Sequence, residues 1–163
     1  MILIGIGSNL SSLNFGSSIE ICNYSLDILE RRSIKIIAKS RWYETEAIPS
    51  STQPHYINGV VSVATELNSL DLLDELMCVE ELLGRTRSIE KEARIIDLDL
   101  IAYNDEISTS NKLTIPHPRA AERAFVARPI SDIAPEWQHP VTGLSIQKII
   151  EPLFEQQIIC VSD

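Results

Sequence analysis

The chain has 163 residues, a length that suits one domain with its own hydrophobic core, so we treat residues 1–163 as a single domain. Asp and Glu number 23 against 14 Lys and Arg, and the resulting net charge of −9 disfavours nucleic acids and anionic membrane surfaces as partners. No apolar run approaches the roughly 18 residues of a membrane span, and the N-terminus lacks the features of a signal peptide. The three cysteines show no CxxC spacing, so we expect no zinc or disulfide framework and a reducing, cytoplasmic location.

The first half of the chain alternates strand patterns with helix patterns. Strands are predicted at residues 1–7, 34–45 and 56–66, and helices at residues 14–31 and 69–84. Gly5 and Gly7 precede Ser8-Asn9, which indicates a tight turn; without a third glycine they do not support a dinucleotide-binding fingerprint. The polar connection at residues 46–54 is long for a hairpin, a property typical of functional loops.

Residues 95–103 predict a strand that carries two carboxylates on one face. Ile96, Leu98, Leu100 and Ala102 would form an apolar face, and Ile95, Asp97, Asp99, Ile101 and Tyr103 the opposite one. Ionised carboxylates are costly to bury unless they are paired or bound to metal. The pattern therefore favours a divalent cation, Mg²⁺ above all, held by Asp97 and Asp99 and by phosphate oxygens. The alternative is an edge strand with two solvated acids.

A cluster of arginines precedes this strand. Arg85, Arg87 and Arg94 are the local concentration of positive charge in an acidic chain, and guanidinium groups bind phosphate in bidentate fashion. Ion pairs with Glu81, Glu90 and Glu92 are the competing explanation. Glu80 falls on the apolar stripe of the predicted helix 69–84, where a carboxylate needs a cationic partner.

The C-terminal third is less regular. A short extended piece at 112–115 leads into Pro116-His117-Pro118-Arg119, in which the flanking prolines restrict the backbone around His117. A short helix is predicted from residue 123 to 130, a second from 144 to 154, and a closing strand at 158–161. The element order predicts an α+β fold with a ferredoxin-like βαββαβ core, whose mainly antiparallel sheet has helices packed on it and is followed by an irregular C-terminal extension.

These residue types suit phosphate chemistry. The chain has no GxxxxGK[ST] motif, so any ATP would be held by metal and side chains rather than by a P-loop. Positioning and neutralisation of charge provide most of the catalysis in phosphoryl-type transfer. The pair Asp97 and Asp99 is a weak motif when taken alone, and it also occurs in nucleotidyltransferases and glycosyltransferases.

Taken together, the motifs resemble the 6-hydroxymethyl-7,8-dihydropterin pyrophosphokinase family of folate biosynthesis. The resemblance covers nearly the whole chain and rests on residues 4–10, 43–45, 53–58, 80–87, 94–100, 116–119, 122–126 and 129–135. It implies Mg²⁺-dependent transfer of diphosphate from ATP to the pterin hydroxymethyl group, with release of AMP. The implied partners are ATP and 6-hydroxymethyl-7,8-dihydropterin, without nucleic acid or membrane; the oligomeric state stays open, a monomer being one alternative.

The resemblance also implies roles for individual residues. Asp97 and Asp99 match the aspartates that bind two Mg²⁺ ions, and together with Arg85 and Arg94 they would serve catalysis. The residues that match ATP-binding positions are Glu80, Arg87, Arg94, Leu100, Lys112, Thr114, His117 and Arg123. The residues that match the pterin site are Thr45, Ile48, Tyr56, Asn58 and Phe125, of which Tyr56 and Phe125 would sandwich the ring.

Two departures separate this chain from the family pattern. Glu90-Lys91-Glu92-Ala93-Arg94 stands where the family usually has Arg-Trp-Gly-Pro-Arg, and Met77 stands where many members have a polar residue. Two alternative functions follow: a ligand-binding relative without catalysis, and a different Asp-x-Asp transferase. The set Tyr56, Asn58 and Phe125 distinguishes the last, since stacking of a pterin needs it and transfer of a sugar does not.

Overall fold

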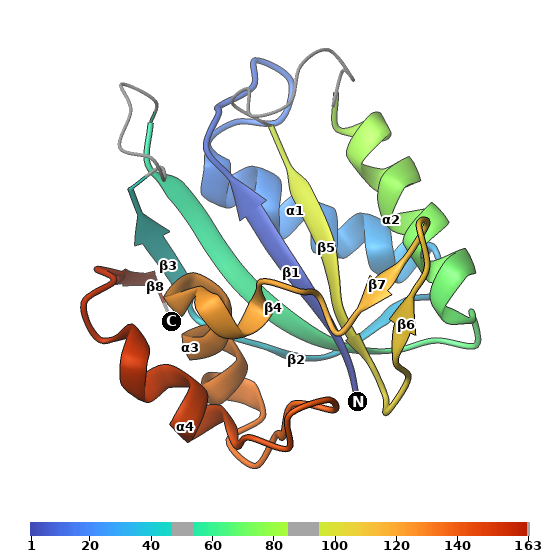
Figure 1. The fold of residues 1–163 in the computed structure, drawn as a ribbon. Coiled ribbons are helices and arrows are strands. Elements are labelled where there is room, and N and C mark those ends of the chain that lie inside the picture. Colours follow the sequence, from blue (N-terminus) through green and yellow to red (C-terminus); the bar gives the residue numbers. More distant parts are fainter. Residues whose placement is uncertain (47–53, 85–94, 163) are drawn as a thin grey trace.

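A computed structural model describes residues 1–46, 54–84 and 95–162 (Figure 1). Its centre is an antiparallel sheet of six strands in the order β5-β1-β4-β3-β8, with β2 also pairing with β4. The strands are β1 (Ile2–Ser8), β2 (Lys35–Lys39), β3 (Trp42–Thr45), β4 (Tyr56–Ala64), β5 (Asp97–Tyr103) and β8 (Ile159–Ser162). A small separate ladder joins β6 (Ser108–Thr109) to β7 (Thr114–Ile115). The arrangement confirms the predicted mixture of helices with an antiparallel sheet.

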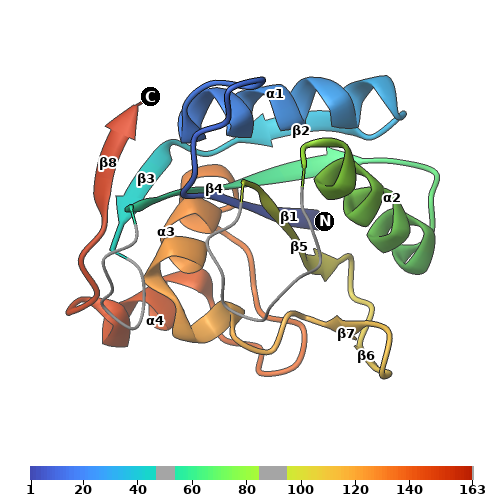
Figure 2. The same cartoon turned by 90° about the horizontal axis from the view of Figure 1, so that it is seen from above.

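Helices cover both faces of the sheet, as Figure 2 shows. The two long helices, α1 (Ser18–Arg31) and α2 (Ser69–Leu82), lie on one face. The other face carries α3 (Ala124–Ile133) and α4 (Ile146–Ile150), with the 3₁₀ turns Ala120–Glu122 and Glu151–Leu153. None of the helices within the described residues combines the length and the apolar character needed to cross a bilayer.

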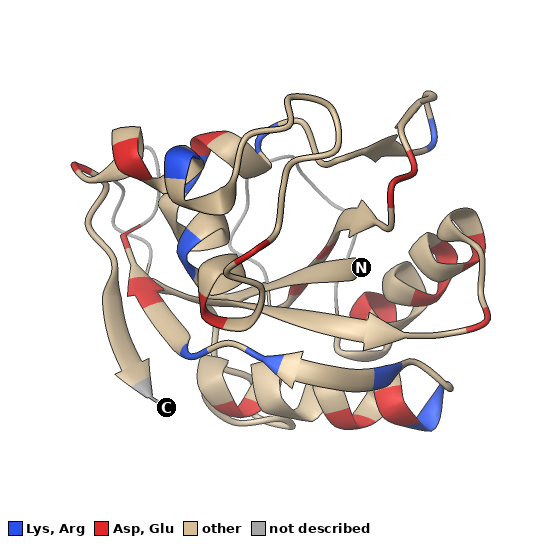
Figure 3. Cartoon of the chain, turned by 90° about the horizontal axis from the view of Figure 1, so that it is seen from below, with Lys and Arg blue, Asp and Glu red and all other residues tan. Residues whose placement is uncertain are grey.

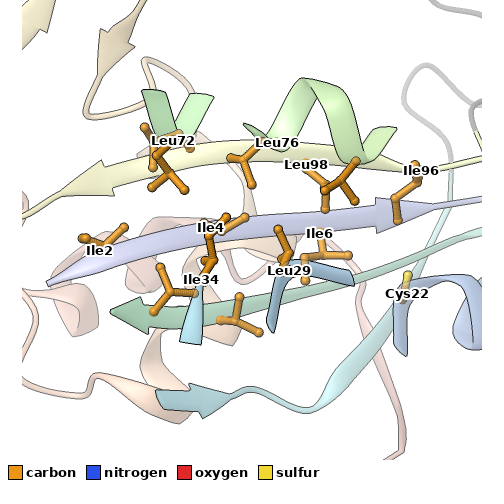
Figure 4. Close-up of a cluster of buried hydrophobic side chains, with 14 of the residues drawn as sticks. Ile2, Ile4, Ile6, Cys22, Leu29, Ile34, Leu72, Leu76, Ile96 and Leu98 are labelled. Atoms are coloured by element: carbon orange, nitrogen blue, oxygen red, sulfur yellow. The ribbon is translucent and has the colours of Figure 1, made fainter. Parts of the chain in front are cut away.

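The larger hydrophobic core lies between the sheet and the two long helices (Figure 4). Ile2, Ile4 and Ile6 of β1 point into it and meet Leu29 of α1 and Leu76 of α2. These isoleucines alternate with Leu3, Gly5 and Gly7, which therefore lie on the opposite face. A second core on that opposite face contains Leu3, Val60 and Ile101, packed against α3 and α4.

The predicted strand at residues 34–45 is two strands in the structure. Both β2 and β3 pair with β4, one after the other, and the pairing of β2 shifts register between Ile36 and Ala38. At the junction the Ser40 hydroxyl accepts the N–H of Val60 at 3.0 Å. This side-chain contact takes the place of a regular ladder bond, and hydrophobic alternation does not record such a contact.

The first helix begins at Ser18, four residues later than the pattern predicts. The Glu20 carboxylate accepts the backbone N–H of Ser17 at 2.8 Å and the Ser17 hydroxyl at 2.6 Å. These hydrogen bonds lower the pKa of Glu20 below its ordinary value. They satisfy the donors at the helix start, which is why the helix begins here rather than at the apolar residue Phe15.

The faces predicted for residues 95–103 are correct from Ile96 to Ile101. They are wrong at Ile95, Ala102 and Tyr103. The pairing between β1 and β5 shifts register between Leu3 and Ile4, so that Ile101 is an extra residue. Beyond this bulge Ala102 joins the core beneath α3, whereas Tyr103 packs against the core beneath α1 and α2, as does Ile95 before the strand. Asp97 and Asp99 precede the bulge and keep the predicted face.

Figure 3 shows the acidic character of α2. The helix contains five Asp and Glu residues and no Lys or Arg. Two of these acids form ion pairs with other elements: Asp74 with Lys112 at 2.9 Å, and Glu75 with Arg32 at the end of α1. The acidic helix thus contacts the segment that carries Lys112.

Candidate active site

The two aspartates lie at the beginning of β5, beside the two glycines of β1. Asp97 is paired with Gly7, and Asp99 with Gly5. Residues directly opposite one another in an antiparallel pair project from the same face. The carboxylates therefore stand on the face of the sheet that α3 and α4 partly cover, and both side chains are half-buried.

The glycines leave the centre of this face without side chains. A Cβ atom on Gly7 would lie 3.3 Å from Oδ1 of Asn58, and one on Gly5 would lie 3.2 Å from Cδ1 of Ile101. Such contacts are tighter than ordinary van der Waals separation. The backbone of β1 thus forms the floor between Asp97 and Asp99 on one side and Asn58 on the other.

The third strand of the site, β4, supplies a polar side chain and an aromatic one. Asn58 is opposite Gly7 on β1 and opposite Tyr43 on β3, while Tyr56 is opposite Thr45. Nδ2 of Asn58 donates a hydrogen bond of 2.9 Å to Oγ1 of Thr45, and both side chains are 7% exposed. The contact fixes the orientation of the Asn58 amide, with Tyr56 half-buried beside it.

Glu80 of α2 contacts the strand between the two aspartates. Its side chain is 3% exposed, and Oε1 accepts the backbone N–H of Leu98 at 2.8 Å. The sequence pattern predicts a cationic partner for this carboxylate, and one contact that the structure provides is with an amide on the edge strand β5. Glu80 thereby joins α2 to the segment that orients Asp97 and Asp99.

His117 lies on the free side of β5. Its backbone N–H donates to the carbonyl of Ile101 at 2.8 Å, and its Nδ1 accepts the N–H of Arg119 at 3.3 Å. Burial lowers the pKa of His117; Arg123 and Arg119 act in the same direction, whereas Asp99 raises the pKa. The neutral imidazole is thus favoured at neutral pH, with Nε2 as the ring atom able to donate.

Arg123 and Phe125 occupy the start of α3. The guanidinium carbon of Arg123 lies 5.4 Å from the centroid of the Phe125 ring, and both side chains are half-buried. Burial, followed by the neighbouring Arg119, lowers the pKa of Arg123, although Asp99 and Asp97 oppose this effect. An anionic ligand therefore stabilises this half-buried guanidinium more than it would stabilise that of a solvated arginine.

An open pocket of about 240 Å³ lies beside Asp99. The residues that line it include Asp99, Leu100, Lys112, Thr114 and His117. Lys112 is exposed and forms its ion pair with Asp74 at the pocket rim. A carboxylate, an ammonium, a hydroxyl and an imidazole therefore converge on one cavity, a donor set suited to a phosphorylated ligand.

The structure thus brings most of the predicted site residues to one face. The phosphate-binding candidates Asp97, Asp99, Lys112, Thr114, His117 and Arg123 lie toward β5 and its free edge, and the pterin-binding candidates Thr45, Tyr56 and Asn58 lie across β1. Ile48, Arg85, Arg87 and Arg94 fall outside the described residues. Within the described residues, no group of three or more His, Cys, Asp and Glu could hold a metal by itself. The donor set of two neighbouring carboxylates suits Mg²⁺ that completes its shell with phosphate and water oxygens.

Pattern reasoning overlooked one part of the site, the end of β1. The predicted strand 1–7 includes both glycines, but the pattern assigns them no role beyond the turn that follows; in the structure Gly5 and Gly7 form the floor of the site. The signal that could have identified them is their spacing of two, which places both on a single face of a strand.

Comparison with known proteins agrees with this geometry. Residues 3–135 match the family model of 7,8-dihydro-6-hydroxymethylpterin-pyrophosphokinase. The chain is 31% identical to the 2-amino-4-hydroxy-6-hydroxymethyldihydropteridine pyrophosphokinase of Haemophilus influenzae, over 96% of this chain and 94% of that protein. It is 35% identical to the protein of the same name from Synechocystis, over 91% of this chain and 74% of the relative.

Larger proteins contain the same unit. The folic acid synthesis protein fol1 of Pneumocystis carinii is 38% identical over 96% of this chain, which spans 20% of that relative's length. A crystal structure of Plasmodium falciparum HPPK-DHPS superposes with a TM-score of 0.72, covering 93% of this chain and 43% of that one, at 16% identity. At this identity the superposition supports the fold alone. The match to the family model and the identities to bacterial relatives show that this chain belongs to the 7,8-dihydro-6-hydroxymethylpterin-pyrophosphokinase family.

Proposed function

We propose that this protein transfers diphosphate from ATP to 6-hydroxymethyl-7,8-dihydropterin in folate biosynthesis, forming the pterin diphosphate and AMP in the presence of Mg²⁺. The observation that carries the proposal is the shared face of β4, β1 and β5. Asn58 and Tyr56 project from it on one side of the glycine floor, and Asp97 and Asp99 on the other. Family membership supports the same reaction.

The pterin is proposed to lie on the β4 side. A flat heterocycle suits stacking on aromatic rings together with a few fixed polar partners. Tyr56 and Phe125 are the aromatic candidates, and the amide of Asn58, held by Thr45, is the polar one. Ile48 belongs to the same proposal through the family resemblance.

The ATP phosphates are proposed to lie on the β5 side. Asp97 and Asp99 would hold Mg²⁺, two ions in all, which neutralises charge on the phosphates when bound. Lys112, His117 and Arg123 would contact the nucleotide with Thr114 and Leu100, while Glu80 supports the strand. Arg85, Arg87 and Arg94 are assigned by resemblance to the phosphates and to the chemical step.

The chemistry is a substitution at phosphorus. The hydroxymethyl oxygen attacks the β-phosphorus of ATP, a new oxygen–phosphorus bond forms, and the bond from the β-phosphorus to the oxygen bridging it to the α-phosphorus breaks. AMP departs with that oxygen, and the hydroxyl proton passes to water. Arg123 stabilises negative charge, the neutral imidazole of His117 donates from Nε2, and Asn58 orients the acceptor, so that the residues act by positioning and by electrostatics.

We propose further that residues 1–163 form one pyrophosphokinase domain, which acts as a monomer in the cytoplasm. Cys22, Cys78 and Cys160 are free thiols, which fits a reducing compartment. ATP and the pterin are the only partners that the proposed site requires.

The test is AMP formation from ATP in the presence of Mg²⁺ and 6-hydroxymethyl-7,8-dihydropterin. We expect AMP and pterin diphosphate in equal amounts and only with all three components present. The matched control is 6-methyl-7,8-dihydropterin, which retains the ring but lacks the attacking hydroxyl, so it should inhibit without forming product. Absence of AMP from well-folded protein would overturn the proposal. Ligand binding without product would favour a non-catalytic relative, and AMP formation without pterin would favour a different transferase.

A further inference from the structure

Two consecutive residues at the end of β1 form hydrogen bonds with the segments that enter the two neighbouring strands. The Ser8 hydroxyl donates to the carbonyl of Ile95 at 2.5 Å, and Nδ2 of Asn9 donates to the carbonyl of Pro54 at 3.3 Å. The side chains of Ser8 and Asn9 are 0% and 1% exposed. Neither residue belongs to the substrate-binding set proposed above.

In both contacts the acceptor carbonyl belongs to a residue that stands two positions before the start of a strand. Ile95 stands two residues before Asp97, the first residue of β5, and Pro54 stands two residues before Tyr56, the first residue of β4. Because β1 runs antiparallel to both strands, its carboxyl end lies between their beginnings (Figure 1). One dipeptide therefore contacts the entry of the strand with the carboxylates and the entry of the strand with the aromatic residue.

The hydrogen bonds extend each sheet ladder beyond its backbone pairs. The ladder between β1 and β5 ends at Gly7 and Asp97, and the ladder between β1 and β4 ends at Ser8 and Ile57. Strand ends lose order first when their last backbone groups lack partners. Bonds from buried donors to the carbonyls of Ile95 and Pro54 oppose this loss at the residues from which Asp97 and Tyr56 project.

We propose that Ser8 and Asn9 are positioning residues that set the spacing between the metal-binding carboxylates and the pterin-binding side chains. We call the pair the Ser8–Asn9 clamp; its role in catalysis rests on the function proposed above. Asp97 and Asn58 are both opposite Gly7, so they are separated by two strand spacings, roughly 10 Å in all, and Tyr56 stands two residues from Asn58 on β4. A reaction between ligands bound on the two sides requires this spacing, because reacting atoms must approach to about 3–3.5 Å and a displacement of about 1 Å costs up to about 100-fold in rate.

The clamp predicts a separate effect for each residue. Ser8→Ala removes the bond at the entry of β5, so it should lower kcat and raise KM for MgATP, with KM for the pterin unchanged. Asn9→Ala removes the bond at the entry of β4, so it should raise KM for the pterin and leave KM for MgATP unchanged. We expect each change to reach about tenfold.

Ser25→Ala is the matched control. The Ser25 hydroxyl is also 0% exposed and donates to a carbonyl, that of Cys22, at 2.7 Å, but donor and acceptor both belong to α1, so this bond joins no two elements. A purely structural role for Ser8 predicts that Ser8→Ala and Ser25→Ala have the same effect on the melting temperature and no effect on kcat or KM of the folded protein. Should Ser8→Ala not fold, Ser8→Cys keeps the size of the side chain and weakens its donor.

Hydrogen exchange tests the clamp without reference to activity. Ser8→Ala should accelerate amide exchange at residues 95–99 by about fivefold, with little change at residues 54–58, and Asn9→Ala should do the reverse. Unchanged exchange at both segments, or equal acceleration in both variants, would overturn the clamp even in an active enzyme. A parent protein that forms no AMP would overturn the proposed function, while the exchange measurements still decide the clamp.

Discussion

The carboxylate of Glu80 accepts a hydrogen bond of 2.8 Å from the backbone N–H of Leu98, the residue between Asp97 and Asp99. The contact joins a nearly buried acid on α2 to the edge strand of the sheet. It provides an edge amide with a partner and holds the backbone from which both aspartates project. The face of β5 that we propose to bind Mg²⁺ is thus supported by a residue on the opposite face.

Replacing Glu80 by Ala should therefore weaken both stability and activity. A buried amide would lose its partner, and we expect the free energy of unfolding to fall by about 1–3 kcal/mol. Glu80→Gln retains an oxygen acceptor and should lose less. Urea denaturation and the AMP assay provide the two measurements. Glu75→Ala on the same helix is the control, because its ion pair with Arg32 is about one-third exposed and is expected to contribute less than about 1 kcal/mol.

Asp97→Asn and Asp99→Asn should each reduce AMP formation by more than about 100-fold, since loss of one negative charge weakens Mg²⁺ binding at the reacting phosphates. Both side chains are half-buried, and we expect the melting temperature to stay within a few degrees of the parent value. Asp27→Asn, at an exposed position on α1, is the charge-matched control. Full turnover in either site variant would rule out the shared metal site.

Asn58→Ala should raise KM for the pterin by about 10- to 100-fold, because a fixed amide would no longer contact the polar edge of the ring. Thr45→Val removes the oxygen that holds this amide at 2.9 Å, and a smaller effect of the same kind is expected. KM for MgATP should be unchanged in both variants. Initial rates with each substrate varied in turn measure the difference, and a change confined to ATP would contradict the assignment of the β4 side.

The stability of the turn around His139 should depend on pH. Burial lowers the pKa of His139 below its ordinary value of 6.5, and its Nδ1 accepts the N–H groups of Val141 and Thr142 at 3.3 Å each. A depressed pKa in the folded state means that the unfolded chain binds the proton more readily. The stabilising contribution is present above pH 6.5 and is lost as the pH falls through the lower folded-state value.

His139→Ala removes this titrating group. We expect the difference in urea midpoint between the parent and His139→Ala to be largest near pH 7.5 and to shrink toward pH 5. Because His117 also has a lowered pKa, the comparison between the two proteins is the informative quantity rather than the pH profile of the parent alone. A difference that stays constant with pH would contradict the role of the neutral imidazole.

Local sequence patterns are enough to predict the helices and strands of the βαββαβ core, apart from the division between β2 and β3, and the position of the carboxylate pair. Alternation along residues 96–101 places Asp97 and Asp99 on one face whatever the strand pairs with, because the period of two is a property of the extended backbone. In the same way, the apolar stripes of α1 and α2 predict two helices packed on a sheet, and the structure confirms this arrangement.

Contacts between residues on different strands and helices depend on how the whole chain packs. The bulge that places Ala102 and Tyr103 on faces opposite to those predicted depends on the register between β1 and β5, which the pattern of one strand does not contain. The contact of Glu80 with Leu98 and those of Ser8 and Asn9 with the entries of β5 and β4 join residues 18, 87 and 45 positions apart. Such partners depend on which backbone groups are left unpaired once the sheet has formed, and local composition does not specify them.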